Sequence, residues 1–173
     1  MAQTTFSGPV LSQNGAGFLG SIVPGLTGLT ATTVATAGTL TYTKNVITVN
    51  NFTGAAAQTV TLPKAEAGVI VIHAQSVDTT GGTAKLIFDC AGTDVLATGS
   101  VVESRTTNAV SFDTSTAGET RLEYTPANAV TNLFSIGSYI YFSCAQDGIW
   151  TVNFKMSMNP ASTGVTGTFA FAA

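Results

Sequence analysis

Charged side chains are missing from both ends of the sequence. None occurs in residues 1–43 or in residues 156–173, and charged residues make up only 9% of the 173-residue chain. A monomeric soluble domain usually distributes Lys, Arg, Asp and Glu over its whole surface. The two ends are therefore predicted to be covered by other protein, which favours a subunit of an assembly.

Basic runs and long apolar runs are also missing. Six Lys and Arg residues stand against nine Asp and Glu, giving a net charge of -3 and a pI of about 4.8. This is a poor supply of cations for phosphate neutralisation, so nucleic acid is not an expected partner. No apolar stretch approaches the roughly 20 residues that span a bilayer. Residues 1–6 show neither the basic nor the apolar region of a secretory signal, which predicts folding in a cytoplasm without membrane attachment.

Histidine occurs once, as His73, so a Ser-His-Asp or Cys-His arrangement would need this residue. It lies in the most apolar run of the chain. The simplest interpretation is a hydrogen-bonded structural histidine, and a catalytic base or ligand is the alternative.

The two cysteines, Cys90 and Cys144, are too far apart in sequence to match a metal-binding spacing. They are interpreted as small buried residues with free thiols. A disulfide between facing strands and a reactive thiol are the alternatives.

Carboxylates do not form a recognisable metal-binding pattern. Asp78, Asp89, Asp94 and Asp113 lie near predicted turns. Asx turns account for such residues without an ion, and Ca²⁺ binding is the alternative.

Catalytic patterns are similarly weak. Glu119 and Glu123 could provide the two carboxylates of sugar hydrolysis, but they are more simply interpreted as solvated residues next to Arg121. The glycines at 15, 17, 25 and 28 lack the strand-then-helix setting of a phosphate-binding loop. We therefore expect no catalytic residue, metal or cofactor, and a protein that is not an enzyme.

Period-two alternation and β-branched residues dominate what is present. Turn clusters recur about every 8 to 12 residues, a spacing typical of a sandwich or barrel. The expected fold is all-β: an antiparallel β-sandwich or a jelly-roll-like barrel with an extended, irregular N-terminal arm. The expected strands cover residues 39–43, 46–49, 58–62, 69–74, 84–90, 94–97, 100–105, 109–113, 120–125, 139–144 and 149–155.

The strongest local pattern is a hairpin between residues 139–144 and 149–155, joined at Asp147 and Gly148. On its second strand, Trp150, Val152 and Phe154 share one face, which should belong to the core. Residues 69–74 are apolar on both faces of the expected strand, which is typical of a central strand.

Two regions follow from this pattern. Residues 1–38 are rich in Gly, Ser, Thr and Ala and carry apolar residues without a sustained period, so they are predicted to be an arm laid onto a neighbour. Residues 39–173 form the β-sandwich domain. Its last segment, residues 164–173, alternates and could add a strand to the edge of its own sheet or of a partner's.

Parts of the sequence resemble small structural proteins of tailed bacteriophages. The relevant runs are residues 58–72 (QTVTLPKAEAGVIVI), 84–89 (AKLIFD), 92–94 (GTD) and 146–152 (QDGIWTV). The opening run, residues 5–15 (TFSGPVLSQNG), is similar to the start of short virion proteins.

This resemblance implies a capsid decoration (cement) protein, placed on the outer capsid surface of a virion assembled in the host cytoplasm. The implied partners are the major capsid protein and further copies of the chain, as a homotrimer. Within the arm, the expected capsid-binding residues are Phe6, Pro9, Val10, Phe18, Leu19 and Ile22.

Two other functions stay open at this point. A tail, fibre or receptor-binding subunit would use exposed Tyr and Asn residues at loop tips, around Tyr124 to Asn132. A glycan-processing enzyme on a jelly-roll would need two carboxylates lining a groove.

Overall fold

The computed structural model describes residues 29–31, 38–79, 82–106, 109–126, 134, 136–155 and 167–173; at 29–31, 103–106 and 109–111 it describes the backbone alone. These residues form strands and loops, with no helix among them. The chain is therefore all-β, as the sequence predicts. Within the described ranges there is accordingly no helix long and apolar enough to cross a bilayer.

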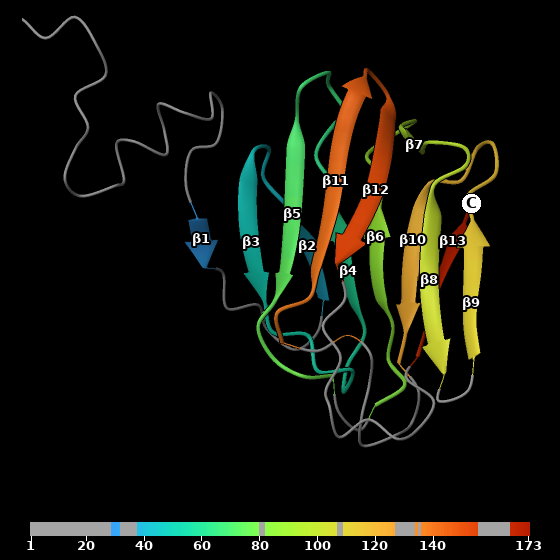
Figure 1. Ribbon diagram of the computed structural model, residues 1–173. Coiled ribbons are helices and arrows are strands. Elements are labelled where there is room, and N and C mark those ends of the chain that lie inside the picture. The colour runs from blue at the N-terminus through green and yellow to red at the C-terminus, as the bar shows by residue number, and fades with distance from the viewer. Residues whose placement is uncertain are drawn as a thin grey trace, which may run out of the picture.

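The larger sheet, called sheet A, has six strands (Figure 1). Residues 69–74 were expected to form a central strand, and the corresponding strand lies inside this sheet, which confirms the prediction. In spatial order the strands are β1 (Leu29–Ala31), β3 (Val46–Asn50), β5 (Ile70–Gln75), β11 (Tyr139–Gln146), β12 (Ile149–Lys155) and β7 (Val95–Leu96).

The second sheet, called sheet B, has five strands and lies behind sheet A in Figure 1. Its spatial order is β13 (Thr168–Ala172), β10 (Arg121–Thr125), β6 (Leu86–Asp89), β4 (Gln58–Thr61) and β2 (Gly38–Thr41). A separate hairpin of β8 (Val101–Thr106) and β9 (Ala109–Thr114) lies beside β13 and β12.

Strands β1 to β6 alternate between the two sheets along the chain. Every second strand therefore rejoins the same sheet, and the pairs β1–β3, β3–β5, β2–β4 and β4–β6 are parallel. The later pairs β5–β11, β11–β12, β6–β10 and β10–β13 are antiparallel. The expectation of antiparallel sheets is thus wrong for the pairs among β1 to β6, because a short connection can cross to the opposite sheet instead of turning back. It is also wrong for β7 and β12, which pair in parallel.

The two sheets keep separate edges. Sheet A ends at β1 and β7, and sheet B ends at β13 and β2. Neither sheet closes on itself, so the expected jelly-roll-like barrel is not formed.

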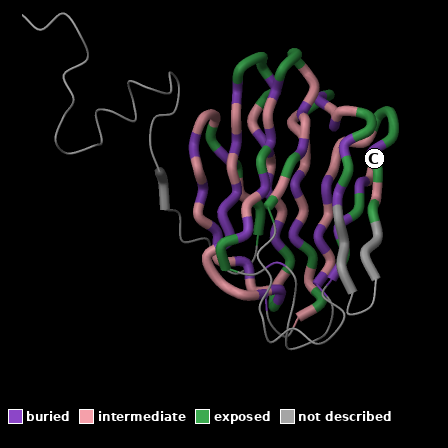
Figure 2. Tube along the Cα trace, in the orientation of Figure 1, coloured by how far each residue is buried: buried purple, intermediate pink, exposed green. Residues whose placement is uncertain are grey.

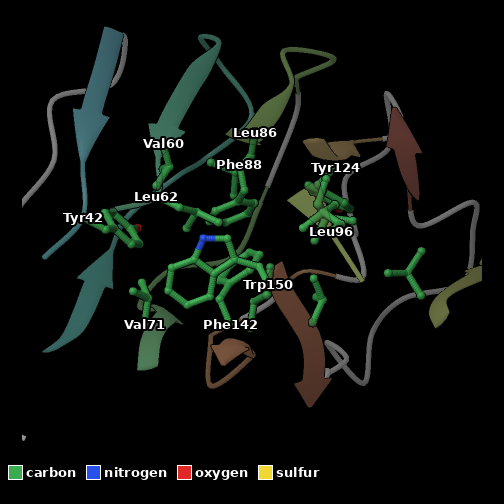
Figure 3. Packing of buried hydrophobic residues seen from close by; sticks show 14 of the residues in the cluster. Tyr42, Val60, Leu62, Val71, Leu86, Phe88, Leu96, Tyr124, Phe142 and Trp150 are labelled. Carbon is green, nitrogen blue, oxygen red and sulfur yellow. The ribbon is translucent and has the colours of Figure 1, made fainter. Parts of the chain in front are cut away.

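One hydrophobic cluster draws side chains from both sheets (Figure 3). Trp150 and Phe142 come from sheet A, while Phe88, Leu86 and Tyr124 come from sheet B; all five are buried. Trp150 and Val152 are buried as predicted, and Phe154 packs against the cluster. Buried and half-buried residues alternate along the strands (Figure 2), as the period-two pattern requires.

Turn chemistry accounts for the strand boundaries. Asn45 adopts a φ of 57° at the bend before β3, a conformation that asparagine tolerates. The hairpin of β11 and β12 turns at Asp147 and Gly148, as predicted, with a register shift between Ser143 and Gln146. The C-terminal strand β13 pairs with β10, so it extends an edge of its own sheet.

Candidate interaction surface

Buried polar side chains connect the two sheets at one end of the core. The Tyr42 hydroxyl lies 2.7 Å from Nδ1 of His73, and it accepts a hydrogen bond of 3.0 Å from Nδ2 of Asn50. Asn50 of β3 also donates to Oε1 of Gln58 in β4, over 2.7 Å. Nε2 of His73 lies 3.2 Å from Oε1 of Gln75. The five side chains form one buried network, in which the hydrogen bond from Asn50 to Gln58 joins sheet A to sheet B.

His73 is fully buried, and burial lowers its pKa to about 3, with a smaller opposing effect from the hydrogen bond to Gln75. The imidazole is therefore neutral at neutral pH. Burial also raises the pKa of the Tyr42 hydroxyl, so this group stays protonated. The structural role predicted for His73 agrees with these contacts.

Aspartate carboxylates mainly hold distant loops. Asp94 is buried and accepts a hydrogen bond of 2.6 Å from the amide of Ala65. Asp113 accepts one of 2.8 Å from the amide of Phe171, and Asp147 one of 2.8 Å from the amide of Ala67. These bonds join segments far apart in sequence. The Asx turns predicted for Asp94 and Asp113 therefore do not account for these contacts.

The described residues offer few side-chain arrangements suited to metal binding or to catalysis in a groove. No cluster of three His, Cys, Asp or Glu side chains occurs there. A shallow depression is lined by Lys64, Ala91, Gly92, Thr93 and Asp94. The Asp94 carboxylate in this depression already accepts the amide of Ala65.

Both cysteines are free thiols. Cys144 is buried and Cys90 is half-buried. Burial, together with the charges of Asp94 and Asp89, raises the pKa of Cys90 to about 12. Protonated thiols are poor nucleophiles, so both cysteines act as small core residues.

The outer face of sheet B is polar and ion-paired. Arg121 donates from Nε to Oδ1 of Asp89 over 2.6 Å, and Lys85 donates to Glu123 over 2.5 Å. Thr59 and Thr61 occupy the outward positions of β4. Glu123 lies beside Arg121, with 3.6 Å between Nη1 of Arg121 and Oε1 of Glu123. This face shows the usual alternation of an antiparallel or mixed sheet with one solvated side.

The outer face of sheet A is different, because its outward positions are apolar. We call this set of residues the apolar face. The inward neighbours Val46, Val71, Ile140 and Phe142 belong to the core, which fixes the alternate positions as outward. The apolar face consists of Ile47 and Val49 in β3, Ile70, Ile72 and Ala74 in β5, and Tyr139 and Tyr141 in β11. Tyr141 is exposed, Ala74 is buried, and the other five are half-buried.

Strand register arranges the apolar face in two main rows. One row runs from Ile47 through Ile72 to Tyr141 and ends at Asn153 of β12. The neighbouring row is Val49, Ala74, Tyr139 and Lys155. Tyr141 is 39% exposed, and its ring centroid lies 6.3 Å from that of Tyr139.

Lys155 is the one charged residue at an outward position of β3, β5, β11 and β12. A contiguous apolar patch on a soluble protein typically marks a binding surface. The contrast between the two outer faces identifies the apolar face as the candidate interaction surface.

The sequence contained a signal for this surface. Strands β3, β5 and β11 carry large apolar residues at both inward and outward positions. In β4 and β10, apolar residues alternate with polar ones. Strand order was needed to show that the first three are neighbours.

The predicted capsid-binding residues Phe6, Pro9, Val10, Phe18, Leu19 and Ile22 lie outside the described residues. The strand β1, at residues 29–31, falls within the segment predicted as the arm and pairs with β3. Tyr124, proposed as an exposed loop-tip residue, is instead fully buried among aromatic rings of the core. This prediction was wrong because Tyr124 lies at an inward position of β10.

No protein-family model, characterised protein or solved structure matches the chain.

Proposed function

We propose that the chain is a structural subunit of a virion, and specifically a capsid decoration protein that stabilises the shell from outside. In this proposal the two sheets pack as a β-sandwich whose faces have different roles. The single observation that carries the structural role is the contrast between the ion-paired face of sheet B and the apolar face of sheet A. The resemblance to small phage structural proteins supplies the virion.

The charge distribution supports an assembled state. Charged residues are confined to positions 44–155, so both ends can lie against other protein without burying an ion. Within the domain, the ion pairs of Arg121 and Lys85 favour contact between sheet B and water. A subunit with this layout presents sheet B to solvent and meets protein elsewhere.

A decoration protein stabilises a shell by binding only the assembled lattice, which shifts the equilibrium away from rupture. An uncharged, glycine-containing segment such as residues 1–28 can follow an irregular groove and contribute main-chain hydrogen bonds. In this proposal Phe6, Phe18 and Leu19 are its apolar anchors on the major capsid protein.

The test is to locate the chain in purified particles of the phage that encodes it. Cryo-microscopy should show its density on the outer capsid surface. Density at the tail or fibre would favour a tail or receptor-binding subunit, and absence of the chain from particles would contradict the virion role altogether.

A variant that lacks residues 1–28 tests the proposed role of the arm in capsid binding. We expect loss of capsid binding without loss of the fold, because the described hydrophobic cluster begins at Tyr42. Trp150 is the single tryptophan and is fully buried, so its fluorescence reports the integrity of the core. Full capsid occupancy by the shortened chain would contradict the role of the arm.

A further inference from the structure

The apolar face needs a partner whose surface is uncharged and of matching shape. Tyr139 and Tyr141 stand on β11, while the smaller Ala74 and the aliphatic Ile72 lie beside them on β5. The face therefore projects further from the sheet along β11 than along β5. A partner must present small side chains opposite β11.

A second copy of the same face meets this requirement. When two copies face each other about a two-fold axis parallel to the strands, between β5 and β11, each β5 opposes the β11 of the other copy. Tyr139 then lies over Ala74, and Tyr141 lies over Ile72. Large residues meet small or aliphatic ones, as in interdigitated sheet packing.

The charges also permit self-pairing. Lys155 of β12 lies in the same row as Val49 of β3, three strands away. The same two-fold axis places β12 over β3, so that each Lys155 meets Val49 rather than the other lysine. The side-chain methylenes of Lys155 can cover Val49.

Polar residues border the apolar face on its β12 side. Asn153, Thr151 and Ser143 continue the outward rows beyond the apolar residues. An apolar centre surrounded by polar residues is the usual anatomy of a protein–protein interface. The acidic residues Asp89 and Glu123 lie on sheet B and point away from such a contact.

The size of the face predicts moderate affinity. Four strands spaced about 4.8 Å apart and roughly 20 Å long give about 400 Å² in projection from each copy. Standard interfaces bury about 800 Å² of accessible surface per partner, and weak ones bury less. We therefore expect association in the micromolar range.

We propose that the apolar face of sheet A binds the same face of a second copy of this chain, forming a two-fold symmetric dimer. The proposal rests on the proposed structural role and names the partner of the same surface. An isologous contact of this kind closes at two subunits. It therefore predicts a dimer for the free chain, in place of the trimer that the phage resemblance implies.

Sedimentation velocity of the full chain over a range of concentrations tests the proposal. The wild-type chain should pass from monomer to dimer in the micromolar range. Ile72→Lys should weaken association at least about 100-fold, because it places an ammonium group at the centre of the interface. Wild-type chain that stays monomeric at high micromolar concentration, or that forms a trimer, would overturn the proposal.

Ile87→Lys is the matched control. Ile87 is also a half-buried isoleucine at an outward position of an inner strand, β6, but on sheet B between Thr59 and Glu123. It should leave the dimer intact. Equal weakening by Ile72→Lys and Ile87→Lys, or an unchanged dimer in Ile72→Lys, would contradict the assigned face.

Tyr141→Lys is a second disrupting variant, chosen because Tyr141 is the most exposed residue of the apolar face. It keeps the test decisive if Ile72→Lys does not fold, as judged by the fluorescence of Trp150. The particle experiment is independent: a monomeric chain found on capsids overturns only the dimer. A dimeric chain absent from particles overturns only the virion role.

Discussion

His73 illustrates how much a single buried polar residue demands of its surroundings. Its two ring nitrogens lie near the Tyr42 hydroxyl and the Gln75 amide, and its ring stacks on Phe134 at a centroid distance of 5.3 Å. None of these contacts offers a carboxylate to stabilise a positive charge. The folded protein therefore opposes protonation of His73.

Acid should consequently destabilise the fold through this residue. The pKa of His73 is about 3 in the folded state and about 6.5 when unfolded, so between these values the unfolded chain binds more protons. The free energy of unfolding falls as the pH falls through this range. By pH 4 the loss attributable to His73 should be about 3 kcal/mol.

Urea unfolding at pH 7 and pH 4 measures the effect, with His73→Gln as the comparison. The glutamine variant cannot take up this proton, so its stability should fall by less than that of the wild type over the same interval. Identical losses in the two proteins would show that His73 is not the source.

The role of His73 could be predicted from its apolar sequence neighbours, but its partners could not. Tyr42 precedes β3, and Gln75 and Asn50 end neighbouring parallel strands. Only the parallel register brings these residues together. Single-residue burial is encoded locally, whereas a hydrogen-bond network depends on strand order.

At the scale of elements, two loops meet backbone to backbone. Gly54 follows β3 with a φ of 82°, and Gly82 follows β5. The carbonyl of Gly54 accepts a hydrogen bond of 3.1 Å from the amide of Ala84. A Cβ atom at Gly82 would overlap this carbonyl, so the connections from sheet A to sheet B cross without room for a side chain.

Gly82→Ala should therefore destabilise the protein by at least about 2 kcal/mol, since overpacking against backbone cannot be relieved by a rotamer change. The control is Gly92→Ala. Gly92 has a φ of 60° and no heavy atom near the added Cβ, so its cost should be only the strain of the left-handed conformation, about 1 kcal/mol. Thermal or urea unfolding of both variants gives the comparison, and a Gly82→Ala cost no larger than that of Gly92→Ala would contradict the crossing.

The strands themselves were largely predictable, because alternation and turn residues act locally. Every expected strand has a counterpart. Pairing direction was not predictable from spacing, which is why β2–β4 and β4–β6 were not foreseen as parallel. The apolar face was missed for the same reason.

At the scale of the whole molecule, the outer faces of the two sheets differ in charge. Sheet B carries the charged side chains of Arg121, Asp89 and Glu123 outward. On sheet A, Lys155 is the one charged residue among the described outward positions of β3, β5, β11 and β12. Such an imbalance directs association to one side of a subunit. It also predicts how salt acts on that association.

Self-association should persist at high salt. At about 0.5 M salt the Debye length is about 4 Å, which removes repulsion between two chains of net charge -3 but leaves apolar contacts unchanged. Sedimentation at low and high NaCl should show equal or tighter association at high salt. Dissociation by salt would indicate an ionic interface instead.

The interleaved path of β1 to β6 also bears on how the molecule forms. Consecutive strands are laid down in opposite sheets, so neither sheet can be completed before the other has begun. Most contacts must therefore be made between distant parts of the chain, which slows folding and couples both halves in one cooperative step.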